Sequence, residues 1–189
     1  MNNVILASAS PRRKELLEKI IPNFKIIASN IIETYPSNLS AFEVALYLSN
    51  LKAHDIYLKN KDSLVIGVDT IVVINNEILG KPSSKDHAKE MLKTLSGNMH
   101  HVITGVTIYQ NNIKYEINSI NKVYFKKLTE QDIDEYLEND EYKDKAGSYA
   151  IQGIANKFID KIEGDFDSIV GLPTKELSSL LNKLINNTN

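Results

Sequence analysis

Short runs of apolar residues and segments with helical spacing alternate through the first half of the chain. Residues 4–7 form an apolar run with the length of a buried strand, and a serine-rich turn leads from it to Pro11. Ser10 is a suitable N-cap, and proline suits the first helical position because the N–H that it lacks has no partner there. Pro22 ends this helix. Its apolar stripe consists of Leu16, Leu17, Ile20 and Ile21.

The most apolar segment of the chain follows a second helix. That helix begins at Ser40 and extends to about Lys59, on the spacing of its apolar residues. Residues 64–74 are nearly all apolar and mostly β-branched, which is typical of a strand buried on both faces. Residues 101–109 and 114–125 alternate in polarity and predict a hairpin. Further elements are expected as strands at 24–28, 78–79 and 158–162, and as helices at 86–95, 129–137 and after Pro173.

This order of elements predicts an α/β fold. Strands and helices alternate first and a hairpin follows, which favours one mixed sheet with helices packed on it. A chain of 189 residues with 42% hydrophobic content can bury a substantial core. We therefore expect a single domain over residues 1–189, built as two lobes around a cleft, with a frayed tail from about residue 186.

Charge and cysteine content exclude several classes of function. With 22 basic and 24 acidic residues, the net charge of −2 gives no broad basic field for a nucleic-acid polymer or a membrane. The absence of cysteine excludes disulfides, thiolate metal sites and cysteine nucleophiles. The basic residues near the N-terminus follow the apolar stretch, the reverse of a secretory signal, and no apolar run has the roughly 18 residues of a membrane helix. The chain is expected to be cytoplasmic, with a small anion as its partner.

The turn after the first strand is a candidate anion site. Ser8 and Ser10 place hydroxyl groups beside the free N–H groups of a helix N-terminus, and Arg12 and Arg13 add fork-shaped donors. An ordinary capped helix with two solvated arginines is the alternative. Positive charge in the first turn opposes the helix dipole, however, and a bound anion would compensate for it.

Asp69 is the second candidate, because it is the one ionisable residue in the apolar segment 64–74. A buried carboxylate is costly unless it is paired or binds a metal. Glu33, in a loop, and Lys81, between glycine and proline, are weaker candidates for a metal ligand and a phosphate contact. Lys52 flanks the apolar stripe of its helix, where a lysine normally keeps its ammonium group in water. The histidines lack metal-ligand spacing, so any metal should be a hard cation bound by oxygen.

Together, SASPRR, VDTIVV, GKP, DKAGSYAIQG and IVGLP, in this order, resemble the Maf-like nucleotide pyrophosphatases over nearly the whole chain. The resemblance implies an inosine-triphosphatase-like fold, an elongated mixed sheet flanked by helices with a central nucleotide cleft, and commonly a homodimer. It also implies a divalent cation (Mg²⁺, Mn²⁺ or Co²⁺) and hydrolysis of dTTP and UTP to the monophosphate and pyrophosphate. 

Individual residues take their expected roles from that resemblance. Asp69 corresponds to the proton acceptor, and Glu33 and Asp69 are the expected metal ligands. Whether Asp69 acts as base, as metal ligand or as both stays open from the sequence. The set that marks the pyrimidine branch comprises Arg12, Thr70 and Gln152. The phosphate-binding set comprises Ser8, Ser10, Arg13, Lys52 and Lys81.

Three alternatives remain open from the sequence. The first is specificity for 7-methyl-GTP within the same enzyme class. The second is a non-catalytic nucleotide-binding regulator of septum formation, which would not need Asp69. The third is a small nucleic-acid-binding module, which the two-arginine turn suggests and the near-neutral charge opposes.

Overall fold

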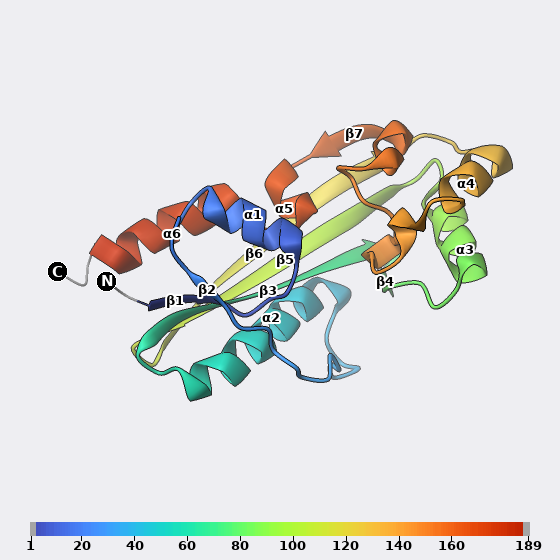
Figure 1. Cartoon of the computed structure of the whole chain (residues 1–189). Helices are drawn as coiled ribbons and strands as arrows, with labels where there is room; N and C mark the ends of the chain where they lie inside the picture. The colour runs from blue at the N-terminus through green and yellow to red at the C-terminus, as the bar shows by residue number, and fades with distance from the viewer. Residues whose placement is uncertain (1–2, 187–189) are drawn as a thin grey trace.

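The computed structural model describes residues 3–186, in which seven strands form one mixed sheet (Figure 1). The strand order is β2-β1-β3-β5-β6-β7, with β4 paired to β3. β1 is parallel to β2 and β3, and the other pairs are antiparallel. The mixed sheet confirms the predicted α/β class. The strands are β1 Asn3–Leu6, β2 Lys25–Ile26, β3 Ser63–Ile74, β4 Glu77–Leu79, β5 Met99–Gln110, β6 Ile113–Phe125 and β7 Ile159–Glu163.

Helices cover both faces of the sheet (Figure 1). α2 packs on one face, where Ile71 and Val73 of β3 point. The other helices contribute to the larger core on the opposite face, where Val68 and Val72 point. β3 is therefore buried on both sides, as its apolar sequence predicted. The helices are α1 Pro11–Glu18, α2 Ala41–Lys59, α3 Lys85–Leu95, α4 Glu130–Leu137, α5 Phe166–Val170 and α6 Thr174–Asn186.

Some boundaries differ from those that the sequence predicted. α1 ends at Glu18, and the N–H groups of Ile20 and Ile21 both bond to the Leu17 carbonyl in a tightened turn. Pro22 disfavours helical backbone in the residue before it, which explains the early end. β2 has two residues instead of five, and α5 is too short to show periodicity in the sequence.

No helix within residues 3–186 is long and apolar enough to cross a membrane. The frayed tail expected from about residue 186 falls on residues 187–189, which lie outside the described part of the chain.

Two glycines allow α2 to approach the sheet closely. A Cβ on Gly67 of β3 would lie 2.3 Å from the Ser49 carbonyl oxygen and 2.6 Å from the Ala53 nitrogen. A Cβ on Gly105 of β5 would lie 2.5 Å from the Ala45 backbone. These collisions involve helix backbone, which cannot move aside as a flexible side chain can. The two glycines therefore set how closely α2 approaches the sheet.

The edge of β3 that faces β1 and β4 has a gap. β1 pairs with the first part of β3, up to Leu6 beside Ile66, and β4 pairs with the last part from Val72 onward. Between these positions no described strand pairs with this edge, although β5 pairs along the other edge from Val65 to Val73. Successive strand residues point to opposite faces. At the gap, side chains from both faces can therefore reach one shared space.

Replacing Gly67 by alanine should destabilise the protein, because the new methyl group overlaps the backbone of α2. We expect a loss of about 1–3 kcal/mol in the free energy of unfolding, the usual cost of overpacking a core. Gly80→Ala is the matched control, since nothing lies within 4 Å of a Cβ at Gly80. Urea unfolding of the three proteins measures the difference. Equal stability of both variants would contradict the close-packing account.

Candidate functional site

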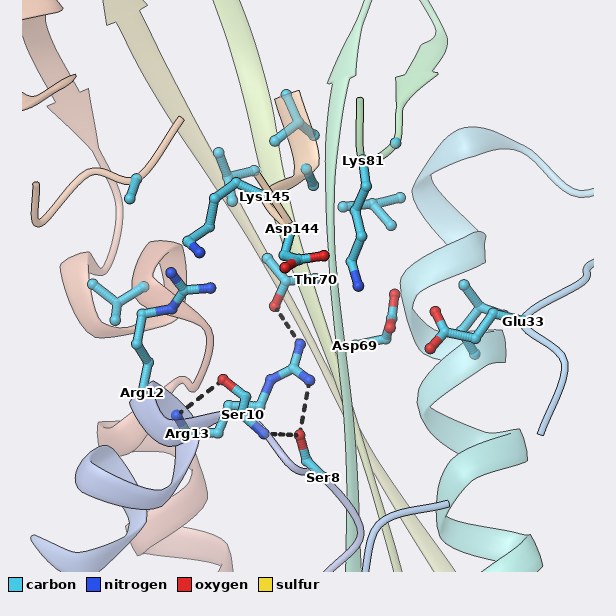
Figure 2. Close-up of a pocket in the computed structure, with 18 of the residues that line it drawn as sticks. Ser8, Ser10, Arg12, Arg13, Glu33, Asp69, Thr70, Lys81, Asp144 and Lys145 are labelled. Carbon is cyan, nitrogen blue, oxygen red and sulfur yellow. Dashed lines mark hydrogen bonds between the residues drawn. The ribbon is translucent and has the colours of Figure 1, made fainter. Parts of the chain in front are cut away.

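A cleft of about 920 Å³ lies at the stretch of β3 that has no strand partner between β1 and β4 (Figure 2). Its walls come from the turn between β1 and α1, the loop before α2, the stretch of β3 that is unpaired on one edge, the end of β4 and residues 144–152. All ten residues singled out from the sequence line it. They are Ser8, Ser10, Arg12, Arg13, Glu33, Lys52, Asp69, Thr70, Lys81 and Gln152.

The turn before α1 orients Arg13 into the cleft. The Ser10 hydroxyl accepts from the Arg13 backbone N–H at 3.5 Å and caps the helix. Three bonds then hold the guanidinium group: Nη1 to Ser8 Oγ and Nη2 to Thr70 Oγ1, each at 3.1 Å, and Nε to the Gly171 carbonyl at 3.2 Å. Burial lowers the pKa of Arg13, and the carboxylate of Asp69 opposes that shift. Arg13 is thus a positioned cation of the cleft, and the interpretation as a solvated helix residue is wrong for it.

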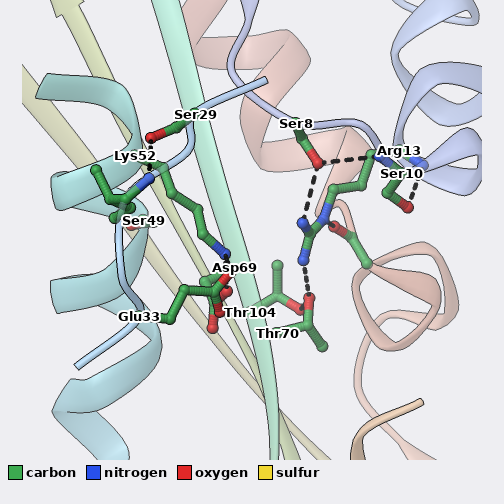
Figure 3. A network of polar contacts seen from close by, with 12 residues as sticks. Ser8, Ser10, Arg13, Ser29, Glu33, Ser49, Lys52, Asp69, Thr70 and Thr104 are labelled. Carbon is green, nitrogen blue, oxygen red and sulfur yellow. Dashed lines mark hydrogen bonds and ion pairs between the residues drawn. The ribbon is translucent and has the colours of Figure 1, made fainter. Parts of the chain in front are cut away.

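The Thr70 hydroxyl is engaged on both sides (Figure 3). It lies 3.0 Å from the hydroxyl of Thr104, its neighbour on β5. Because Thr104 donates its proton to the Ser168 carbonyl at 2.8 Å, Thr70 donates to Thr104 and accepts from Arg13. Thr70 therefore holds the Arg13 guanidinium in place.

Asp69 lies in the gap of β3 with only 6% of its surface exposed. Lys52 Nζ donates to its Oδ1 at 2.5 Å and pairs with Glu33 Oε1 at 2.9 Å. Burial raises the pKa of the Asp69 carboxyl, and the charges of Lys52 and Arg13 oppose this effect. A raised pKa brings a carboxylate closer to the range in which it acts well as a general base.

Lys52 corrects the interpretation drawn from its helical position. The stripe of α2 placed it where a lysine usually extends to water, yet it is only 9% exposed. α2 approaches the sheet so closely that the lysine side chain reaches the buried carboxylate of Asp69 instead. The pairing partner was therefore not visible in the sequence pattern of either element.

The remaining predicted residues surround this centre. Lys81 follows β4, and its side chain extends toward Asp69 in Figure 2. Arg12 is half-buried, and burial lowers its pKa while the charge of Glu141 opposes this. Gln152 is exposed where residues 144–152 close the cleft.

Sequence reasoning missed two charged residues of the cleft, Asp144 and Lys145 (Figure 2). Burial lowers the pKa of Lys145, and the positive charge of Arg12 adds to that effect. Asp144 has φ +59°, a left-handed conformation that aspartate tolerates better than most residues. The signal was available, because both begin the DKAGSY motif. With them the cleft contains five cations and three carboxylates, which suits an anionic ligand.

Two carboxylates of the cleft could contribute to a metal site. Glu33 and Asp69 both contact the Lys52 ammonium group, so the two carboxylates share one cationic partner. Within the described residues no group of three or more His, Asp or Glu side chains could hold a metal ion. The donor set therefore fits a Mg²⁺-like ion that takes one or two carboxylates and completes its shell with phosphates and water.

Comparison with known proteins places the chain among relatives that it matches along most of its length. A protein from Cytophaga hutchinsonii named dTTP/UTP pyrophosphatase is 46% identical over 97% of this chain and 85% of its own length. One of the same name from Bacillus pumilus is 48% identical over 92% of each chain. Among solved structures, a HAM1 protein from Coxiella burnetii gives a TM-score of 0.47 at 14% identity, covering 66% of this chain and 73% of that one. Residues 3–184 match the family described as Maf-like protein, and the chain belongs to that family.

Proposed function

We propose that this protein is a nucleoside triphosphate pyrophosphatase that hydrolyses dTTP and UTP to the monophosphate and pyrophosphate. The observation that carries the proposal is a single cleft in which the buried carboxylate of Asp69 lies among five cations, in a chain whose net charge is negative. The names and the 46–48% identity of the relatives support the choice of substrate.

The phosphate chain would lie between the turn before α1 and Lys81. Pro11 has no N–H and the Arg13 N–H bonds to Ser10 Oγ, so the first turn of α1 offers an anion the backbone N–H of Arg12. Arg13 uses three of its five N–H donors within the protein and keeps the others for phosphate oxygens. Lys81 approaches from the opposite wall. Cations on both sides would stabilise the charge that develops on the leaving pyrophosphate.

Asp69 is the proposed general base. Lys52 engages its Oδ1, which leaves Oδ2 to accept a proton from the attacking water. The water oxygen then bonds to the α-phosphorus, the bond to the bridging oxygen breaks, and pyrophosphate leaves. Because its pKa is raised, Asp69 is better suited to accept a proton than an ordinary surface aspartate is.

A divalent cation is part of the proposal, with Mg²⁺, Mn²⁺ or Co²⁺ as candidates. Glu33 and Asp69 would hold it. When bound, the cation would neutralise phosphate charge and lower the pKa of a water bound to it. Lys52 contacts both carboxylates, so it would have to share or yield this position.

Three residues are proposed to set the preference for the base. Gln152 is exposed in the cleft, and its amide can donate to and accept from one pyrimidine edge. Arg12 lines the same cleft as a half-buried cation. Thr70 contributes through Arg13, whose guanidinium group it holds.

The homodimer and the cytoplasmic location stay predictions, and the family resemblance supports the homodimer. Light scattering of the purified protein measures the molar mass of the assembly.

Asp69→Asn should abolish pyrophosphate release while the fold stays intact. Asparagine keeps the shape of the side chain but cannot accept the proton, so kcat should fall about 10²- to 10⁴-fold. Asp160→Asn, which removes an exposed carboxylate of β7, is the control. Circular dichroism monitors folding. More than about a tenth of wild-type kcat in Asp69→Asn would refute the assignment.

Arg13→Ala and Lys81→Ala should each lower kcat/KM, by about 2–4 kcal/mol of transition-state stabilisation. Arg13→Lys should recover little, because an ammonium group cannot satisfy the Ser8, Thr70 and Gly171 acceptors together. The matched control is Lys14→Ala, an exposed neighbour on α1. Steady-state pyrophosphate release gives the comparison. The phosphate role is wrong for both residues if their variants keep wild-type kcat/KM.

The wild-type protein should hydrolyse dTTP and UTP well, and ATP, GTP and 7-methyl-GTP poorly. A site that hydrogen-bonds one base edge leaves polar groups unpaired when another base enters. Gln152→Ala should therefore lose base preference more than it loses hydrolysis. A screen of kcat/KM over these triphosphates with each metal measures both effects. A higher value for 7-methyl-GTP than for dTTP would overturn the pyrimidine preference and leave the pyrophosphatase proposal standing.

A further inference from the structure

The carboxylate of Glu141 occupies the turn directly after Gln152. Glu141 belongs to a short 3₁₀ segment, Asp140–Tyr142, and is half-buried. Its two oxygens accept from the Ile154 backbone N–H at 3.1 and 3.0 Å, and one of them also accepts from the Ala155 N–H at 3.4 Å. A carboxylate that binds adjacent N–H groups fixes the path of the backbone between them. The turn is thereby attached to a segment 13 residues earlier in the chain.

Gly153 provides the space for this carboxylate. A Cβ on Gly153 would lie 1.2 Å from Glu141 Oε1, so a side chain there and the bound carboxylate exclude each other. The φ of Gly153 is −106°, outside the left-handed region that favours glycine. Glycine at this position therefore serves to admit Glu141.

The charge of Glu141 also acts on two cations of the cleft. It opposes the lowering of the Arg12 pKa and of the Lys145 pKa by burial. One side chain outside the cleft thus contacts the turn after Gln152 and acts electrostatically on two cations of the cleft. Glu141 itself does not line the cleft.

We propose that Glu141 is a positioning residue for base selectivity. By holding the backbone after Gln152, it keeps the amide of Gln152 and the guanidinium group of Arg12 at the separation that a pyrimidine requires. This inference rests on the proposed function, in which these two residues contact the base. It assigns Glu141 no contact with the phosphates or with the attacking water.

Two variants remove the same contact by different routes. Glu141→Ala removes the carboxylate, and Gly153→Ala expels it while leaving the net charge unchanged. Each should lower the ratio of kcat/KM for dTTP to that for ATP by about tenfold or more, mainly through a higher KM for dTTP. The double variant should be no worse than either single variant, because both act on one contact. Asp140→Ala, which removes the adjacent exposed carboxylate, is the matched control.

Two further measurements separate positioning from a general loss of structure. The inhibition constant of inorganic pyrophosphate, which has no base, should change by less than about twofold in both variants. Amide hydrogen exchange of Ile154 and Ala155 should accelerate in both variants and stay unchanged in Asp140→Ala.

If the wild-type protein is active, and Glu141→Ala and Gly153→Ala both keep its ratio of kcat/KM for dTTP to that for ATP, this inference alone is overturned. Unchanged exchange at Ile154 and Ala155 would do the same. A rise in the pyrophosphate inhibition constant as large as the rise in KM for dTTP would place Glu141 in the phosphate site instead. Wild-type protein that hydrolyses neither dTTP nor UTP would overturn the proposed function, and the selectivity role with it.

Discussion

Asp69 is buried in β3, an apolar strand, where an unpaired carboxylate would be strongly destabilising. Its pairing with Lys52 offsets that cost, and this contact constrains much of the structure around it. Lys52 reaches Asp69 because α2 lies directly on the sheet, and α2 can lie there because Gly67 and Gly105 present no side chain to it. A strand partner at this edge of β3 would close the space that both residues share.

The gap in β3 explains how one cleft collects residues from both faces of the sheet. Asp69 faces α2 with Lys52 and Glu33, while the next residue, Thr70, faces the N-terminus of α1 and holds Arg13 (Figure 3). The carboxylates and the guanidinium group therefore meet across the width of one strand. The proposed proton acceptor and the proposed anion site are therefore close together, although they lie on opposite faces of the sheet.

The local sequence was sufficient for most elements and for the chemistry of single residues. The apolar run of β3, the Ser10 cap of α1 and the hairpin of β5 and β6 follow from periodicity and capping, and the structure has all three. The existence or the bounds of very short elements could not be predicted. α5 has five residues, too few for a helical period to be recognised, and the strand expected at 24–28 is only the two residues of β2.

The residues that share the cleft are determined partly by local sequence and partly by tertiary packing. The sequence identified Asp69 as a costly charge and the turn at Ser8 as a candidate anion site. Both follow from residues that are close together in the sequence: the apolar run around Asp69, and the helix start next to Ser8. The pairing of Lys52 with Asp69, the support of Arg13 by Thr70 and the contact of Glu141 with the turn after Gln152 span 13 to 57 residues of chain. Such contacts depend on the packing of α2, β3 and the loop before β7. Only the tertiary structure decides them, since no local pattern encodes the distance between segments that meet after folding.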